Sequence, residues 1–301
     1  MPDPLEIFRT VTDTVAAIVD TEPEPQSETP CPDWNYAQLL GHLVGGDRLF
    51  AGLLTGRSSL PTSPRMAPDA DQPPPAPSDY RTWSSQLATV FGDPEIRAGT
   101  FEVPVGRLTG GQVIVLRSVE HFLHGWDLAK AGDAPTIGLE PVATALDGPA
   151  RQLLAAVGDR TLGERRPFAS SLEIGEHAGA VERLVAAFGR DPGWAPDPVA
   201  GYARLTERFA DHADVELPDG TRRGFGADGL RVRSQVFACT HRDQLMIKLP
   251  AGEVDRLVGT GLGQPLSKAG QRPMREWVLV PFDGASARRV DRAYVFVSGQ
   301  G

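Results

Sequence analysis

The chain has 301 residues and a formal net charge of −9, from 39 acidic and 30 basic side chains. This length favours two domains. The acidic excess lies in residues 1–195, with 26 acidic against 15 basic side chains, and it argues against nucleic acid as the main partner. Cys31 and Cys239 are the only cysteines and lie far apart, which excludes a disulfide framework and a cysteine-rich zinc module. There is no apolar run of membrane-spanning length and no secretory signal pattern, so we expect a soluble, cytoplasmic protein that does not bind membranes.

Apolar side chains recur at helical spacing over residues 1–190. Asp3, followed by a proline, is expected to cap the first helix, and Asp33 to cap a second helix that reaches about Leu54. Residues 56–78 are dense in Pro and Ser and predict a long surface loop. Further helices are expected from Ser78 to Gly92, after Gly111 up to Gly132, within 141–157 and within 178–188. The first part of the chain therefore predicts a helical bundle.

The pattern changes after Trp194, where a proline-rich segment precedes a short helix and then β-rich runs. The helix is expected at about 199–212. Strands are expected in 229–239, 244–249 and 276–280, with helices at 253–258 and near 284–294. Residues 196–301 therefore predict a small α+β domain, with the boundary near residue 195.

Two of the predicted helices carry ionisable side chains where core residues are expected. His42 lies among the apolar positions of the second helix, while Glu120 and His124 stand four residues apart on the fourth and so share one face. Two imidazole nitrogens and one carboxylate, with one coordination position left open, are typical of a catalytic metal centre. The alternative is that Glu120 pairs with His124 and that His42 is a satisfied core histidine; spacing alone leaves both open.

Neighbouring residues carry weaker signals. His121 follows Glu120 by about 100° around the helix, so we expect it to point away from the other two as a packing or surface residue. Asp127 is placed to hydrogen-bond the second nitrogen of a histidine ligand. The Gly45–Gly46 pair lowers helix stability and allows close approach of another helix or of a ligand, of which close packing is the favoured reason.

Three ordered motifs resemble a known family: residues 29–45, which contain His42; residues 120–129, which contain Glu120 and His124; and Gly189-Arg-Asp-Pro192. They are similar to the DinB-like proteins, specifically the N-terminal domain of mycothiol-dependent maleylpyruvate isomerases, over roughly residues 1–195. The resemblance implies a four-helix bundle with a divalent metal, usually zinc, on the residues that match His42, Glu120 and His124.

The resemblance also implies a reaction. The open position of the metal would accept a low-molecular-weight thiol, mycothiol in actinobacteria, and stabilise its thiolate for attack on a small electrophile. The outcome is transfer of the thiol or cis–trans isomerisation. Arg outnumbers Lys 27 to 3, a bias that fits a GC-rich actinobacterial genome.

Residues 196–301 resemble the TfoX N-terminal and YjbR-like α+β domains, whereas the isomerase carries a sterol-carrier-like domain. Arg272 and Arg275 are candidates for binding an anionic substrate, against the alternative that they are surface arginines in a proline-containing loop.

The sequence thus predicts a metal-dependent, mycothiol-type S-transferase or isomerase whose partners are the thiol and a small substrate, with self-association into a homodimer left open. Two other functions compete with it. The same three ligands would suit a mononuclear Fe(II) oxygenase, and the protein could be a non-catalytic, metal-containing binding or regulatory protein.

Overall fold

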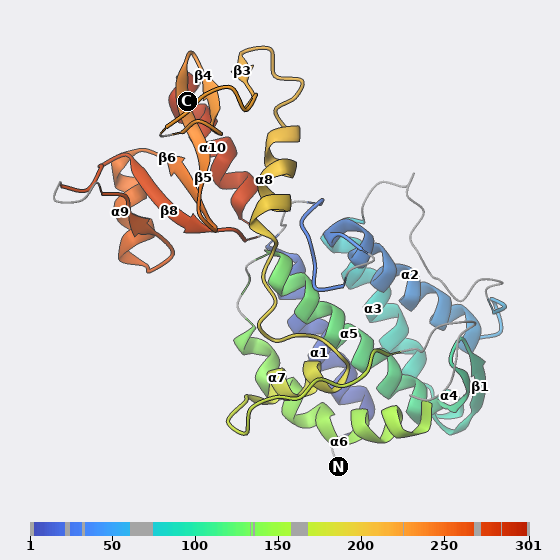
Figure 1. Ribbon diagram of the computed structural model, residues 1–301. Helices are drawn as coiled ribbons and strands as arrows, with labels where there is room; N and C mark the ends of the chain where they lie inside the picture. The colour runs from blue at the N-terminus through green and yellow to red at the C-terminus, as the bar shows by residue number, and fades with distance from the viewer. Residues whose placement is uncertain are drawn as a thin grey trace. The chain divides into compact units, whose positions relative to one another are not determined.

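The computed structural model describes residues 3–21, 25–31, 34–60, 75–132, 134, 136–157, 168–224, 226–267, 272–283 and 285–299 (Figure 1). The chain divides into two compact units, Met1–Trp194 and Ala195–Gly301. The first has one apolar core and the second has a larger and a smaller apolar cluster. The predicted combination of a helical region with a mixed helix-and-sheet region is confirmed. None of the helices described is both long and apolar enough to cross a membrane.

The described residues of the first unit form helices and one two-stranded hairpin. Its elements are α1 (Pro4–Val19), α2 (Tyr36–Leu54), α3 (Pro77–Phe91), α4 (Pro94–Ala98), β1 (Thr100–Val103), β2 (Gly106–Thr109), α5 (Gly110–Gly132), the 3₁₀ turn η1 (Ile137–Leu139), α6 (Glu140–Val157) and α7 (Ala180–Ala187).

Helix α5 is the central element of the first unit. Most of its side chains are buried, as expected for a helix that is covered on several sides. It packs against α1, α2 and α6, and Figure 1 shows α1 and α5 side by side. Gly125 permits that approach, because a Cβ at this position would collide with the Val15 side chain of α1. Because α5 is held on several sides, the side chains that it directs toward α2 have fixed positions.

Helix α2 begins later than predicted. Asn35 is its N-cap: the Asn35 side chain accepts a hydrogen bond from the Gln38 amide at 2.9 Å, and the Gln38 side chain accepts one from the Asn35 amide at 3.1 Å. This reciprocal capping box starts the helix at Tyr36, so the expectation that Asp33 caps it is wrong. Asp33 lies outside the described residues, as does most of the predicted 56–78 loop.

The segment before α5 contains elements that the sequence did not predict. Asp93 caps the short helix α4, with a proline as the first helical residue. Strands β1 and β2 then form an antiparallel hairpin, with Thr100 opposite Thr109. These elements are only four or five residues long, too short for a clear period in the sequence.

The second unit is a six-stranded antiparallel sheet with helices. In chain order its elements are α8 (Pro198–Glu207), β3 (Val215–Glu216), β4 (Leu230–Val232), β5 (Gln235–His241), β6 (Gln244–Lys248), α9 (Ala251–Gly259), β7 (Gln264–Pro265), β8 (Trp277–Pro281) and α10 (Ser286–Ser298). The strand order is β3-β4-β5-β6-β8-β7. The larger apolar cluster contains buried side chains from β4, β5, β6 and β8 and from α8, α9 and α10.

Two predictions for this unit are corrected. The β-rich run 229–239 is not one strand: it is interrupted at Arg233 and Ser234, whose φ values of 52° and 62° form the tight turn between β4 and β5. The helix expected at about 199–212 ends at Glu207.

Candidate metal centre

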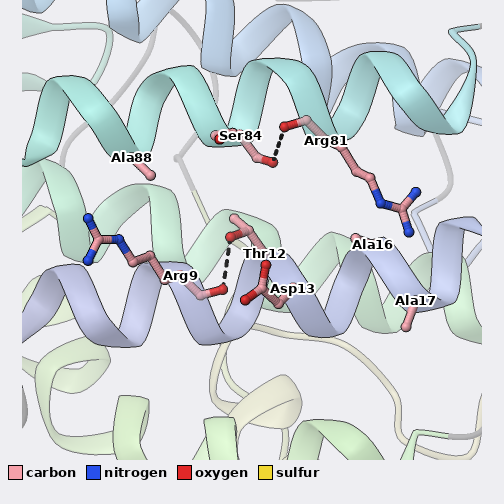
Figure 2. Close-up of a pocket in the computed structure, with 9 residues that line it drawn as sticks. Arg9, Thr12, Asp13, Ala16, Ala17, Arg81, Ser84 and Ala88 are labelled. Atoms are coloured by element: carbon pink, nitrogen blue, oxygen red, sulfur yellow. Dashed lines mark hydrogen bonds between the residues drawn. The ribbon is translucent and has the colours of Figure 1, made fainter.

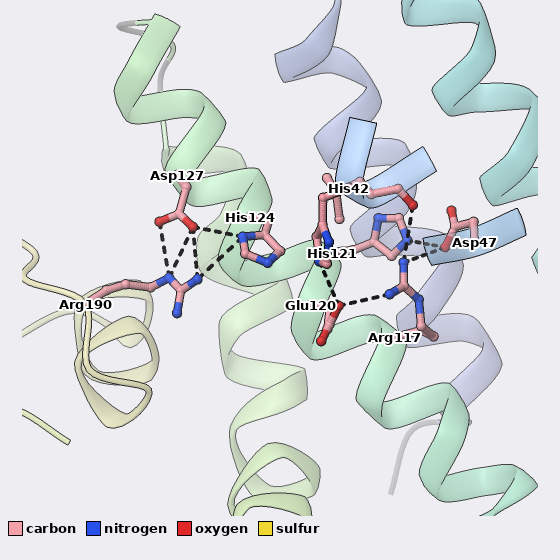
Figure 3. A network of polar contacts seen from close by, with 9 residues as sticks. His42, Asp47, Arg117, Glu120, His121, His124, Asp127 and Arg190 are labelled. Carbon is pink, nitrogen blue, oxygen red and sulfur yellow. Dashed lines mark hydrogen bonds and ion pairs between the residues drawn. The ribbon is translucent and has the colours of Figure 1, made fainter. Parts of the chain in front are cut away.

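Three potential ligands meet between α2 and α5. His42 comes from α2, and Glu120 and His124 stand one turn apart on α5 (Figure 3). Each offers one ligand atom, and the three atoms all lie within 4.8 Å of one another. His42 Nε2 is 3.4 Å from Glu120 Oε2. The structure therefore brings together the three residues that the sequence singled out, in an arrangement that could hold a metal ion.

The triad is partly accessible and bordered by an aromatic ring. The exposed fractions of the His42, Glu120 and His124 side chains are 11%, 25% and 10%. The Trp34 ring stacks on His42 with centroids 4.4 Å apart and planes at 27°, and its centroid lies 6.0 Å from that of His124. Trp34 thus restricts the orientation of the His42 ring and forms one wall of the site.

A buried carboxylate orients His124. Asp127 Oδ2 lies 3.0 Å from His124 Nδ1, and Asp127 itself is fully buried. If Nδ1 carries the hydrogen that Asp127 accepts, the Nε2 lone pair is available to a metal. Arg190, from the segment after α7, donates to Asp127 from Nε at 3.2 Å and from Nη2 at 3.0 Å. Figure 3 shows this pair on one side of the triad.

The surroundings set protonation states that suit a divalent cation. Burial lowers the pKa of His124 to about 4, although its hydrogen bond to Asp127 opposes the change. Burial raises the pKa of Glu120, but the hydrogen bond to His42 and the positive charge of Arg117 outweigh it and hold that pKa well below its usual range. At neutral pH the site therefore offers a neutral imidazole and an ionised carboxylate, the forms that bind metals.

A second ion pair lies on the other side of the triad. Arg117 donates from Nη1 to Glu120 Oε2 at 2.9 Å and from Nη2 to Asp47 Oδ1 at 2.8 Å. His121 is a packing residue and not a surface one: its fully buried ring lies edge-on to Phe8. Its two nitrogens also have polar partners, Asp47 and the Tyr80 hydroxyl. The sequence analysis did not identify Asp47, Arg117 or Tyr80 as part of this network. The available signal for Asp47 was a charged residue among the apolar positions of α2.

Arg272 and Arg275 belong to the second unit, where both are exposed. Their role as substrate ligands stays a prediction.

A separate pocket lies between α1 and α3 (Figure 2). Small and hydroxyl-bearing side chains line it, and Arg9 and Arg81 also belong to its lining. The hydroxyls of Thr12 and Ser84 donate to carbonyl groups of their own helices. No triad residue contributes to this lining, so the pocket is distinct from the candidate metal centre.

Comparison with known proteins adds two relatives and one family. The relatives are Uncharacterized protein Rv0738 and Uncharacterized protein MT0763, from two strains of Mycobacterium tuberculosis. Each is 29% identical over 196 residues, which cover 62% of this chain and 98% of the relative. No solved structure matches the chain. Residues 5–129, a segment that includes all three residues of the triad, match the family model of the mycothiol maleylpyruvate isomerase N-terminal domain.

Proposed function

We propose that the chain is a cytoplasmic, metal-dependent S-transferase or isomerase that uses mycothiol or a similar small thiol. In this proposal α1, α2, α3 and α5 form a DinB-like four-helix bundle, and His42, Glu120 and His124 hold a divalent cation, zinc. The observation that carries the proposal is the convergence of three donor atoms within 4.8 Å, inside the segment that matches a mycothiol-related family.

The donor set fits a catalytic centre better than a structural one. Structural zinc sites commonly use four protein ligands, whereas catalytic sites use three and leave a position for water or substrate. Among the residues that the structure describes, the group of potential ligands has three members, and each of their side chains retains some solvent exposure. A small thiol could therefore reach the open position.

A divalent cation bound to these residues would lower the pKa of a coordinating thiol and keep it as the thiolate, which is the nucleophile. The thiolate sulfur would then form a bond with an electrophilic carbon of the substrate. Departure of a leaving group with the electron pair of its bond to that carbon would give transfer. Addition to a double bond, rotation about the resulting single bond and expulsion of the same thiolate would give isomerisation.

The residues around the triad have defined tasks in this scheme. Asp127 holds the hydrogen on His124 Nδ1 and so presents the other nitrogen as a ligand. Arg190 neutralises the buried Asp127 carboxylate. Trp34, stacked on His42, offers an apolar surface to the thiol or the substrate.

The second unit is assigned more coarsely. Its resemblance to TfoX N-terminal and YjbR-like domains stays a prediction, as do a substrate role for Arg272 and Arg275 and the formation of a homodimer. We propose that this unit contributes to substrate selection.

The test uses the cobalt-substituted full-length chain, since thiolate coordination to Co(II) produces a charge-transfer absorption band. Added mycothiol should produce the band in the wild type and in His177→Ala, an exposed histidine of the same unit, but not in His42→Ala. A panel of small electrophiles, including cis-enoyl acids and activated halides, then distinguishes isomerisation from transfer. Oxygen consumption with Fe(II) and without thiol would point instead to an oxygenase, and metal binding without a thiol band would leave a binding role.

A further inference from the structure

A fully buried polar chain runs from α3 to the candidate metal ligand Glu120. The Tyr80 hydroxyl lies 2.8 Å from His121 Nδ1, and His121 Nε2 lies 2.9 Å from Asp47 Oδ1. Arg117 then joins Asp47 to Glu120 from two different nitrogens of its guanidinium. The chain links three helices, and its last contact is with a proposed ligand, as Figure 3 shows for the part from His121 to Glu120.

The buried charges are costly if stability is their only purpose. Arg117 is 1% exposed and Asp47 is fully buried. A buried ion pair is often no more stabilising than apolar side chains of similar volume. Asp47 Oδ2 and Arg117 Nε, moreover, have no hydrogen-bond partner among the described residues. An apolar pair at these positions would avoid both costs.

Helix α2 is adapted to admit the guanidinium. A Cβ on Gly46 would lie 2.8 Å from both Nη atoms of Arg117, a distance at which one of them must move. A glycine within a helix costs roughly 1 kcal/mol relative to alanine. The adjacent Gly45 has nothing within 4 Å of its own ideal Cβ, so the close approach is specific to Gly46. Gly46 therefore leaves the space that the Arg117 guanidinium occupies and that the Cβ of an alanine would fill.

The guanidinium of Arg117 couples Glu120 to the buried Asp47. Nη1 is engaged by Glu120 Oε2 and Nη2 by Asp47 Oδ1, so movement of the Glu120 carboxylate would disturb the buried pair. His121 is the immediate neighbour of Glu120 on α5 and holds Asp47 from the other direction. A carboxylate fixed in this way is pre-organised for a metal, and a ligand that also accepts a charged hydrogen bond donates less electron density to the ion.

We propose that the Asp47–Arg117 pair, anchored by His121 and Tyr80, positions Glu120 for metal binding and thereby sets the affinity of the site and the electrophilicity of its metal. Arg117 is a positioning residue, because it acts through Glu120 and not on the substrate. This inference rests on the proposed function, since it requires a metal on the triad.

Arg117→Lys is the most direct test. Lysine keeps the positive charge beside Asp47, but its single nitrogen lacks the planar fork that engages Asp47 and Glu120 from two separate nitrogens. We expect zinc affinity of the full-length chain, measured by competition with a fluorescent chelator, to fall roughly 10–100-fold, the usual effect of removing a partner of a metal ligand. The visible spectrum of the Co(II) form should change as well, which a purely structural role would not produce. Arg151→Lys, in an exposed pair of the same unit, is the matched control and should leave both readouts unchanged.

A second variant guards against misfolding. The double substitution Asp47→Leu with Arg117→Met removes both members of the buried ion pair, a change that is often neutral for stability. It also removes the partner of His121 Nε2, so its fold is checked by circular dichroism, and the folded variant should bind zinc more weakly by a similar factor. Wild-type affinity and an unchanged cobalt spectrum in either folded variant would overturn the inference. His42→Ala distinguishes failure of the proposed function from failure of this inference. If wild type and His42→Ala bind zinc equally, the proposed function itself fails. If His42→Ala loses zinc but the Arg117 variants do not, the assignment of the triad stands and only the role of Arg117 is refuted.

Discussion

Replacing Asp127 by asparagine removes the buried charge that joins Arg190 to His124. The Asp127 side chain is fully buried, the Arg190 side chain is 16% exposed, and three donor–acceptor contacts of 3.0 to 3.2 Å connect them. Removing one partner of a buried pair typically costs about 3–5 kcal/mol. Because Arg190 retains some solvent contact, we expect the lower end, about 3 kcal/mol of unfolding free energy.

The same substitution should weaken the metal site. An asparagine oxygen can still accept from His124, but it lacks the charge that makes the imidazole a stronger donor. A loss of roughly tenfold in zinc affinity is expected, equivalent to about 1.4 kcal/mol. Calorimetry should show the melting of the first unit about 6–12 °C lower, from about 2–4 °C per kcal/mol at this size. Chelator competition gives the affinity.

Asp147→Asn is the control, because Asp147 forms an exposed pair with Arg151 on α6 and such pairs contribute little. If Asp127→Asn matched that control in both melting and affinity, the assignment of Asp127 as a partner of the metal ligand would be wrong. If only the stability fell, Asp127 would have a structural role alone.

Three further outcomes are expected. At pH 8 in the native state iodoacetamide should label Cys31 but not Cys239, since burial raises the pKa of Cys239 to about 12; equal labelling by mass spectrometry would contradict this. Gly46→Ala should destabilise the chain by about 1–3 kcal/mol through overpacking, whereas Gly45→Ala should be neutral or stabilising by up to about 1 kcal/mol, as urea unfolding would measure. Burial lowers the folded-state pKa of His124 to about 4, so as the pH falls the unfolded state takes up this proton before the folded state does. The unfolding free energy of the metal-free protein should therefore fall by up to about 1.4 kcal/mol per pH unit as the pH drops below about 6.5. A His124→Gln variant with the same pH dependence would disprove that contribution.

The long helices were predictable from local patterns, but some of their limits were not. Asp3 and the proline after it mark the start of α1 as expected. The start of α2 was misassigned because Asp33 and Asn35 are both good caps, and the reciprocal hydrogen bonds with Gln38 decide between them. The turn between β4 and β5 escaped notice because it uses Arg233 and Ser234 in place of the glycine or asparagine that usually marks such a turn.

Some residues of the candidate site were predictable from local spacing, and others were not. The i, i+4 spacing of Glu120 and His124 is a local property of α5, and Asp127 follows on the same helix. Asp47 and Arg190, by contrast, reach the site from other elements, and only tertiary packing brings them to α5. The sequence marked Asp47 only as a charge among the apolar positions of α2, and Arg190 only as part of the motif Gly189-Arg-Asp-Pro192. Neither sign names the partner.

The central claim is that His42, Glu120 and His124 hold a catalytic metal, and elemental analysis of the purified full-length protein tests it most directly. The wild type and His177→Ala should contain close to one equivalent of zinc, while His42→Ala and Glu120→Ala, folded by circular dichroism, should contain almost none. Equal metal content in all four proteins, or none in the wild type after zinc reconstitution, would contradict the account.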